Sequence, residues 1–259
     1  MLFCGVMYTW FMEIITSTQN RLVKLARSLS ERKFRVELGL FLAEGVNLLR
    51  DMPNDVEVEF VFATESRYDE ACEMFAERNV KGGIICVSDA VMNSVSDTAS
   101  PYGIAAVCKI PSVQFEMPNG NALLLDGVSD PGNVGTIMRT AAACGFCTVF
   151  ALNSADIYSP KVIRATLGAL FKIKVCVIDE VQALTLMRNC NSAVLDMGGR
   201  SLLDGKIPSP ILFVAGSEAH GVRESLKREA KNIFSLPMKN QIESLNVAVA
   251  TAVAMYQTV

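Results

Sequence analysis

Residues 236–257, LPMKNQIESLNVAVATAVAMYQ, are the stretch that decides the fold of this chain. A strand-like start ends at Pro237, and the polar loop after it carries Glu243, Ser244 and Asn246. The chain then continues as a predicted helix that is apolar almost all round, and a helix without a polar face is expected to be buried on all sides. Chain termini normally lie at the surface. We therefore expect another part of the molecule to enclose this segment, and its polar entrance is a candidate site.

The composition is that of a globular protein with a large core. Of the 259 residues, 51% are hydrophobic and 20% are charged, which allows two modest domains or one large one. Residues 1–12 are apolar, but they are too short to span a bilayer and lack the basic start of a secretory signal. We interpret them as an extension or as an upstream start, with Met12 opening the functional chain. No membrane role is expected.

The eight cysteines lie mostly inside apolar runs, a pattern typical of buried free thiols in a reducing cytoplasm. Cys144 and Cys147 form a CxxC motif. No second CxxC and no nearby histidine completes a set of zinc ligands. The sequence therefore predicts a cytoplasmic protein without a metal site.

The charge of the chain is unevenly distributed. The formal net charge is −3 and the isoelectric point is about 5.4, so no global positive field attracts nucleic acid. Residues 20–40 nevertheless carry a local net charge of +4. Their basic residues are Arg21, Lys24, Arg27, Arg32, Lys33 and Arg35. This basic helix is either an ordinary solvated face or a surface that contacts phosphates.

Helices and short strands alternate along the whole chain. Before residue 110 we expect helices at 20–36, 44–50 and 68–78, and strands at 40–43, 59–63, 84–87 and 104–108. Residues 111–121, rich in proline, glycine and asparagine, are the best linker candidate. After it we expect strands at 122–126, 148–152, 174–178, 193–196 and 211–215, with helices near 133–144, 160–170, 180–190 and 221–231. Near-continuous apolar strands separated by helices predict an α/β fold with a mostly parallel sheet covered on both faces.

The first stretch with candidate chemistry is LDGVSDPGNVGTIMR, residues 125–139. A strand enters a glycine-rich turn, Asn133 sits where a helix would be capped, and Arg139 follows inside that helix. Such a turn can bind an anion at the helix N-terminus. The phosphate-binding and dinucleotide-binding glycine patterns are both missing, so a well-capped helix is the alternative interpretation.

The second stretch is LFVAGSEAHGV, residues 212–222. Its hydrophobic strand delivers Gly216, Ser217 and Glu218 to a strand end, where open α/β sheets bind ligands. Glu218 there accepts hydrogen bonds from a substrate, orients an arginine, or caps the following helix. His220, the only histidine, is expected to be solvated, because no nucleophile-elbow motif accompanies it.

The third stretch is the C-terminal one, where Ser244 and Asn246 read locally as a pair of N-cap residues.

Together the three stretches resemble the SpoU/TrmH family of SPOUT-class RNA 2′-O-ribose methyltransferases. The resemblance is carried by three blocks, which are N-x-G-x-x-x-R at Asn133–Arg139, G-x-E-x-x-G at Gly216–Gly221, and PM…ESLNVAVA at 237–250. The N-terminal part resembles the substrate-binding domain that precedes many such enzymes, with a basic helix followed by F-x-x-E-G at Phe41–Gly45. Ser217 and Thr166 depart from the family pattern, which usually has Asn and Ser there.

The resemblance implies a trefoil-knotted α/β domain over residues 113–259, which binds S-adenosyl-L-methionine in the knot and works as a homodimer. A smaller α/β RNA-binding domain at 14–112 and an N-terminal extension at 1–13 precede it. The implied catalytic residues are Asn133, Arg139, Glu218, Ser244 and Asn246. The implied cofactor-binding residues, acting largely through backbone groups, are Leu212, Val214, Ala215, Gly216, Leu236, Met238, Ser244 and Leu245. The RNA-binding candidates on the basic helix are Arg21, Lys24, Arg32, Lys33 and Arg35.

The implied reaction is methylation of a ribose 2′-hydroxyl in RNA, with ribosomal RNA favoured over tRNA because of the extra N-terminal domain. The alternatives are a tRNA methyltransferase and a non-catalytic RNA-binding assembly factor on the same fold. Arg139 is implied to act on the 2′-hydroxyl. Because a guanidinium stays protonated, we expect it to hold the neighbouring phosphate and orient the hydroxyl, while a role as base stays open.

Overall fold

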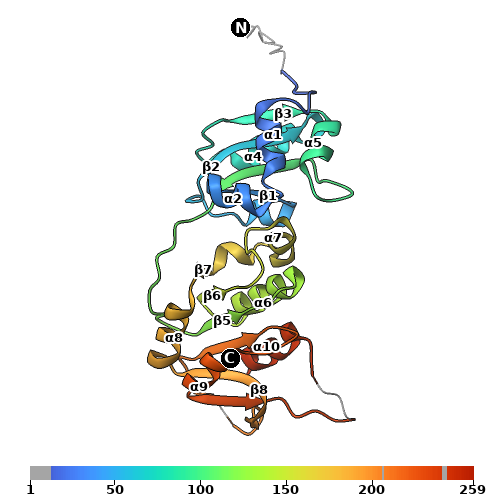
Figure 1. The fold of residues 1–259 in the computed structure, drawn as a ribbon. Helices are drawn as coiled ribbons and strands as arrows, with labels where there is room; N and C mark the ends of the chain where they lie inside the picture. The colour runs from blue at the N-terminus through green and yellow to red at the C-terminus, as the bar shows by residue number, and fades with distance from the viewer. Residues whose placement is uncertain (1–12, 206, 241–243) are drawn as a thin grey trace, which may run out of the picture. The chain divides into compact units, whose positions relative to one another are not determined.

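The computed structural model describes residues 13–205, 207–240 and 244–259. These form two compact units; Figure 1 colours the first from blue to green and the second from green to red, apart from the blue segment Asn47–Pro53. The first comprises residues 13–46 and Asn54–Lys109, and the second comprises Asn47–Pro53 and Ile110–Val259. The membership of Asn47–Pro53 in the second unit is a feature that the sequence pattern did not indicate. The extension 1–12 and Glu243 lie outside the described residues.

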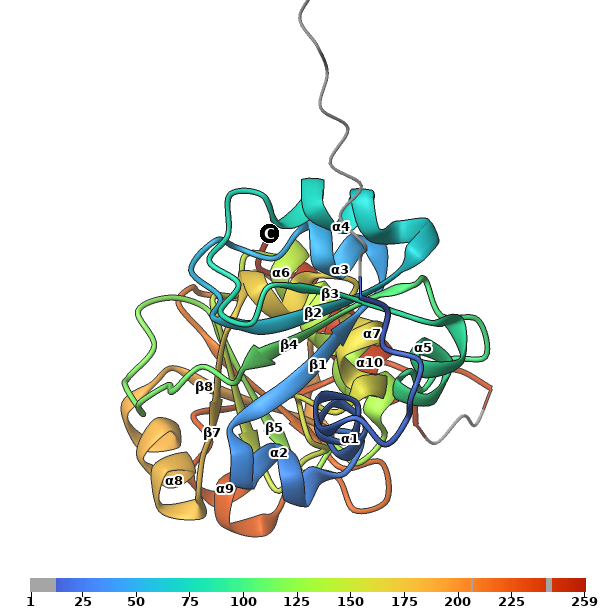
Figure 2. The same ribbon diagram turned by 90° about the horizontal axis from the view of Figure 1, so that it is seen from above.

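The first unit is built on a mixed four-stranded sheet. Its strands are β1 (Leu40–Glu44), β2 (Val58–Thr64), β3 (Ile84–Val87) and β4 (Ile104–Lys109), in the order β1-β4-β2-β3. Strand β4 runs antiparallel to both neighbours, and β3 is parallel to β2. Its helical segments are α1 (Arg21–Ser28), α2 (Arg32–Leu38), η1 (Glu65–Arg67), α4 (Tyr68–Phe75) and α5 (Asp89–Val95). Helices α1 and α5 share a core with Phe60 and Phe62, and α4 lies on the opposite side of the strands (Figure 2).

The single helix expected at 20–36 is two helices, α1 and α2, separated by a turn. Helix α1 ends at a turn in which the Leu29 side chain is buried in the core, the Leu29 N–H donates to the Ala26 carbonyl oxygen at 3.2 Å, and the Ser30 N–H donates to the Arg27 carbonyl oxygen at 3.2 Å. Arg35 holds the turn from the other side, since its Nη1 donates to the Leu29 carbonyl oxygen at 2.6 Å. The basic residues therefore occupy two separate helices.

The second unit is built on a six-stranded sheet in which every pair of neighbours is parallel, which confirms the predicted fold class. Its strands are β5 (Ala122–Asp126), β6 (Thr148–Leu152), β7 (Lys174–Val177), β8 (Ser192–Ser201), β9 (Leu212–Gly216) and β10 (Asn232–Ser235). They lie in the order β10-β8-β9-β5-β6-β7. Strand β8 is longer than expected, and β10 lies just before the strand-like start that the sequence indicated at Pro237. The register between them shifts between Ile233 and Phe234, so that Ile233 pairs with Val194 and Phe234 with Arg200.

The helical segments of the second unit are α6 (Pro131–Ala143), α7 (Pro160–Thr166), η2 (Ala169–Lys172), α8 (Glu180–Asn189), α9 (Glu224–Glu229) and α10 (Val247–Tyr256), together with all but the first residue of α3 (Val46–Arg50). Helix α6 is capped by Asp130, whose Oδ1 accepts from the Asn133 N–H at 2.8 Å. The expectation that Asn133 is the cap was therefore wrong. Helices α6 and α7 pack so closely at Gly135 that a Cβ added there would lie 2.3 Å from the Ala165 Cβ. Only glycine fits at this crossing.

Residues 111–121 are a packed segment of the second unit, although they read as a linker. Val113 and Phe115 pack against the core cluster of the parallel sheet, and the Phe115 ring meets Phe150 edge to face at 6.1 Å. Lys174 of β7 pairs with Glu116 at 2.6 Å. The segment thereby protects the sheet next to the edge strand β7.

Helix α10 packs on α6 and β9 through Ala248, Thr251, Ala254 and Met255, which are buried. Its other side is open in the single chain, where Val249 is 50% and Tyr256 is 58% exposed. The expectation of burial on all sides was therefore wrong for one chain. Among the residues that the structure describes, the side chains of Val249 and Tyr256 form an apolar stripe that is exposed to solvent. Among the described residues, no helix is long and apolar enough to cross a membrane.

Candidate active site

A cleft of about 460 Å³ opens at the C-terminal end of β9 and beside the middle of β8. It is lined by residues from β8, from the loop after β9, and from the start of α10, among them Asp196, Gly216, Glu218, Ser244, Asn246 and Thr251. A smaller pocket of about 130 Å³ shares several of these walls and is mostly apolar, with Leu195, Phe234, Leu236, Met238 and Leu245. Together they form a cavity with an apolar part and a polar mouth, which is the usual composition of a small-molecule site.

The loop after β9 is a closed turn that presents Glu218. Ser217 and Gly221 exchange backbone hydrogen bonds of 3.0 and 2.9 Å, and the His220 N–H donates to the Ser217 Oγ at 3.0 Å. The turn is so tight that a Cβ added at Gly216 would lie 2.1 Å from the Gly221 carbonyl carbon. His220 itself is exposed, in agreement with its expected solvation.

Glu218 bridges from this turn to the start of α6. Its Oε2 accepts from the Ser129 N–H at 3.3 Å and from the Ser129 Oγ at 3.2 Å. Its Oε1 accepts from the Asp130 N–H at 3.4 Å and from the Asn133 Nδ2 at 2.9 Å. Glu218 is not the cap of the following helix α9, whose N-cap is Arg223. Its carboxylate instead accepts from an asparagine 85 residues away in the sequence.

The electrostatics of Glu218 follow from these contacts. Burial raises the pKa of the Glu218 carboxyl group. The hydrogen bonds from the Asn133 side chain and from the backbone of Ser129 and Asp130 together lower it by more, so the pKa lies below its ordinary value of 4.5. A carboxylate with this pKa and four donors is a poor proton acceptor at neutral pH. Its arrangement suits orientation of Asn133 instead of general-base catalysis.

Asn246 completes a chain of side-chain amides. Its Nδ2 donates to the Asn133 Oδ1 at 2.9 Å, while its Oδ1 caps α10 by accepting from the N–H groups of Ala248 and Val249. Asn246 is therefore an N-cap residue as expected, and it is also tied to the first stretch. Ser244 lies in the wall of both pockets and is not a cap.

Arg139 lies apart from these residues. It sits six residues after Asn133 on α6, which places it about 120° around the helix and about 9 Å along it. Its side chain is exposed, together with Thr136 and Ala143 on the same face. It is not among the residues that line the cleft, and within the described part of the chain it forms no hydrogen bond or ion pair.

Six of the eight expected cofactor-binding residues line the two pockets: Ala215, Gly216, Leu236, Met238, Ser244 and Leu245. Leu212 and Val214 do not. Both are buried in the core cluster of the sheet, and both belong to the part of β9 that pairs with β5 and β8. We correct these two to packing residues, since neighbouring strands flank their backbone on both sides.

Asp196 is a site residue that the sequence did not reveal. It lines both pockets from β8, and its Oδ2 pairs with the Lys227 Nζ at 2.6 Å. The hydrogen bond from Lys227 lowers the pKa of Asp196, so this carboxylate is ionised in the cleft. The available signal was its place at the end of a predicted strand, beside the strand that ends in Gly216. Among the described residues, no group of histidine, cysteine and acidic side chains has the arrangement of a metal site.

The basic residues of the first unit separate into two groups. Arg21, Lys24, Arg32 and Lys33 are exposed. Arg35 is only 3% exposed and bonds to the Leu29 carbonyl oxygen. We therefore remove Arg35 from the RNA-binding candidates, because a buried guanidinium that stabilises a turn cannot reach a phosphate.

Comparisons with known proteins give a consistent result. The model of the SpoU rRNA Methylase family matches residues 120–256, and that of the MRM3-like substrate binding domain matches residues 20–106. The 23S rRNA (guanosine(2553)-2′-O)-methyltransferase RlmP of Bacillus subtilis is 32% identical over 95% of this chain and 98% of its own length.

Solved structures agree over nearly the whole chain. An RNA 2′-O ribose methyltransferase matches with a TM-score of 0.79 and 28% identity, covering 95% of this chain and 97% of the other. An AdoMet-bound rRNA methyltransferase from Sinorhizobium meliloti shares the fold, with a TM-score of 0.84 at 24% identity over 95% and 96% of the two chains.

Proposed function

Because the chain belongs to the SpoU rRNA methylase family, we infer that it is an S-adenosylmethionine-dependent RNA 2′-O-ribose methyltransferase, and we propose ribosomal RNA as its substrate. The observation that carries the site assignment is the chain of hydrogen bonds from Glu218 through Asn133 to Asn246, which joins the three sequence blocks at one cleft. The free thiols of the described cysteines suit the cytoplasm, where we place the enzyme.

The cavity fits the cofactor by the chemistry of its walls. The apolar pocket around Leu195, Leu236 and Leu245 suits the purine, and the polar cleft with the Asp196 carboxylate suits hydroxyl and ammonium groups. When bound, the cofactor supplies a methyl group activated by its sulfonium. We propose that Ala215, Gly216, Leu236, Met238, Ser244 and Leu245 hold it, with Asp196 as an additional contact.

We propose that the hydrogen-bonded side chains of Glu218, Asn133 and Asn246 position the ribose that accepts the methyl group. Glu218 fixes which way the Asn133 amide faces, because its carboxylate accepts only from the Nδ2 side. The Asn133 Oδ1 then orients Asn246, whose Oδ1 is held by the N-terminus of α10. The Asn246 amide, which lines the cleft, and the Asn133 amide bonded to it are thereby held in fixed orientations, and we propose that the acceptor hydroxyl approaches beside them. Positioning of this kind contributes a large part of the acceleration of a two-substrate transfer.

We propose a homodimer that covers the exposed face of α10 and the neighbouring face of α6. Val249 and Tyr256 supply the apolar area on α10. Arg139 lies on the exposed face of α6 and is turned away from Asn133. In the dimer, Arg139 of one copy is proposed to serve the cleft of the other copy, where it holds the substrate phosphate and orients the 2′-hydroxyl. Its guanidinium stays protonated, so it acts as a donor and not as the base.

The expected trefoil knot belongs to this proposal. The segment after β10 returns to the cleft beside β8, where Ser244 and Leu245 face Asp196 and Met197. In the first unit, the exposed side chains of Arg21, Lys24, Arg32 and Lys33 are proposed to contact RNA phosphates.

The test of the function is a map of 2′-O-methyl sites in total RNA from cells with and without the gene. Loss of one site in ribosomal RNA, restored in vitro by the purified protein and S-adenosylmethionine, is the expected result. Loss of a tRNA site instead would show that the substrate is tRNA. An unchanged map, together with no methyl transfer in vitro, would support a non-catalytic RNA-binding factor.

A further inference from the structure

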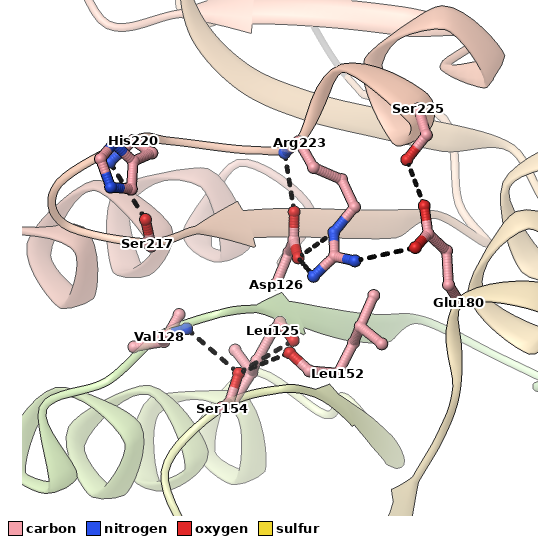
Figure 3. A network of polar contacts seen from close by, with 10 residues as sticks. All are labelled: Leu125, Asp126, Val128, Leu152, Ser154, Glu180, Ser217, His220, Arg223 and Ser225. Atoms are coloured by element: carbon pink, nitrogen blue, oxygen red, sulfur yellow. Dashed lines mark hydrogen bonds and ion pairs between the residues drawn. The ribbon is translucent and has the colours of Figure 1, made fainter.

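Asp126 lies at the end of β5 and is in register with Gly216, the last residue of β9. Its side chain is 3% exposed, and its two oxygens are both used by Arg223. Oδ2 accepts from the Arg223 backbone N–H at 2.8 Å, and Oδ1 accepts from Nε at 2.7 Å and pairs with Nη2 at 2.6 Å (Figure 3). One buried carboxylate thus fixes both the backbone and the side chain of Arg223.

Arg223 stands at the far end of the turn that carries Glu218. It follows Val222, which is buried in the core, and it precedes α9. The turn itself is held closed by Ser217 and Gly221. The outer side of the guanidinium contacts Glu180 of α8 at 3.3 Å, and Glu180 also accepts from the Ser225 Oγ at 2.6 Å (Figure 3). Arg223 therefore ties the exit of the turn to both β5 and α8.

The two carboxylates Asp126 and Glu218 form a reciprocal pair. Asp126 comes from the segment 126–133 and binds the segment 216–223, whereas Glu218 comes from 216–223 and binds Ser129, Asp130 and Asn133 in 126–133. Ser154 supports the first segment, since its Oγ donates to the Leu125 carbonyl oxygen and accepts from the Val128 N–H (Figure 3). Neither segment can shift along the other without breaking a charged contact.

We propose that Asp126 and Arg223 are positioning residues for methyl transfer, which act by fixing the turn that holds Glu218 and thereby the Asn133 and Asn246 amides. This inference rests on the proposed function. Neither residue lines the cleft, so their effect reaches the reacting groups only through this turn. A displacement of about 1 Å at a catalytic group can cost about 100-fold in rate.

The test compares Arg223→Gln and Asp126→Asn with Arg188→Gln, which removes a matched ion pair between α8 and α9, Arg188–Glu229 at 2.8 Å. We expect kcat to fall by about 100-fold in the first two variants, with little change in the KM for RNA. Arg223→Lys, which keeps the backbone contact and one charged donor, should recover part of kcat. Arg188→Gln should match the wild type. Thermal unfolding of each variant establishes that it is folded.

A double variant distinguishes positioning from general stabilisation. In a Glu218→Gln background the turn is already without its other anchor, so Arg223→Gln should reduce kcat much less than it does alone. Effects that simply multiply, or a wild-type kcat in folded Arg223→Gln and Asp126→Asn, would overturn the inference.

Amide exchange gives a readout that needs no catalysis. Exchange in peptides covering 126–133 and 216–223 should accelerate in Arg223→Gln and not in Arg188→Gln. If the wild type transfers no methyl group but exchange responds in this way, the proposed function fails and the reciprocal anchoring stands. Unchanged exchange would refute the anchoring itself.

Discussion

The Asn246 side-chain amide donates to the Asn133 side-chain oxygen at 2.9 Å, across 113 residues of sequence. The same Asn246 caps α10 with its own side-chain oxygen. One residue therefore serves two purposes, helix capping and alignment of a second amide at the cleft. These purposes can be separated by substitution.

Asn246→Asp should keep the cap and lose the alignment. Aspartate is as good an N-cap as asparagine, whereas alanine costs about 1 kcal/mol. We expect Asn246→Asp to unfold near the wild-type denaturant midpoint and Asn246→Ala to unfold earlier, while both lose more than about tenfold in methyl transfer, which corresponds to about 1.4 kcal/mol. Activity retained by Asn246→Asp would show that the amide donor is not needed.

Glu218 should stabilise the fold in a pH-dependent way. Its pKa in the folded chain lies below the ordinary value of 4.5, so its stabilisation is complete above that pH and is lost as the pH falls through the folded-state pKa. The difference in unfolding free energy between wild type and Glu218→Gln should therefore be largest at neutral pH and shrink in acid. Urea unfolding over a pH series measures it. Glu77→Gln, at an exposed position, is the control and should show no such trend.

Arg139→Ala should abolish methyl transfer and leave cofactor affinity unchanged, because Arg139 does not line the cleft. Calorimetry with S-adenosylmethionine measures the affinity. If Arg139 serves the partner's cleft, a mixture of Arg139→Ala and Asn246→Asp chains should recover activity, since mixed dimers hold one intact cleft. No recovery after subunit exchange would place Arg139 in its own chain's site.

Charge reversal at Arg32 and Lys33 should weaken RNA binding and flatten its dependence on salt, by roughly one unit of log–log slope for each phosphate that the protein no longer neutralises. Both side chains are exposed, so the fold should be unaffected. Arg35→Ala is the contrasting variant. It should lower the denaturation midpoint, because the buried bond to Leu29 is removed, and leave the salt slope unchanged. If charge reversal at Arg32 and Lys33 leaves the salt dependence of RNA affinity unchanged, these residues do not contact RNA and the RNA-binding surface lies elsewhere.

Val249→Glu should convert the proposed dimer to monomers. Val249 is 50% exposed on α10 in the single chain, so the substitution is tolerated in a monomer and places a charge in a dimer interface. Light scattering at several concentrations gives the mass. Thr136→Ser, a small change on the neighbouring helix, is the control. A wild-type chain that is monomeric at all concentrations would contradict the dimer directly.

The sequence by itself determined most of the elements and most of the residues of the site. Apolar strands such as 122–126 and 148–152 read correctly, because a strand buried on both faces leaves a continuous apolar run whatever its neighbours are. Glu218, Ser244 and Asn246 were placed at one cleft from the three sequence blocks. The basic character of residues 20–36 was also visible, since charge needs no structure to be counted.

The tertiary structure decided the relations between these parts. Local patterns made Asn133 a cap and Arg35 a surface residue, but strand order brings Glu218 and Asn246 to Asn133, and the turn at Leu29 takes Arg35 inside. The partners of Asp196 and of Asp126 could not be predicted from the sequence, because they depend on which strand ends become neighbours. Such contacts join residues that are far apart in the chain, and only the folded sheet sets which of them meet.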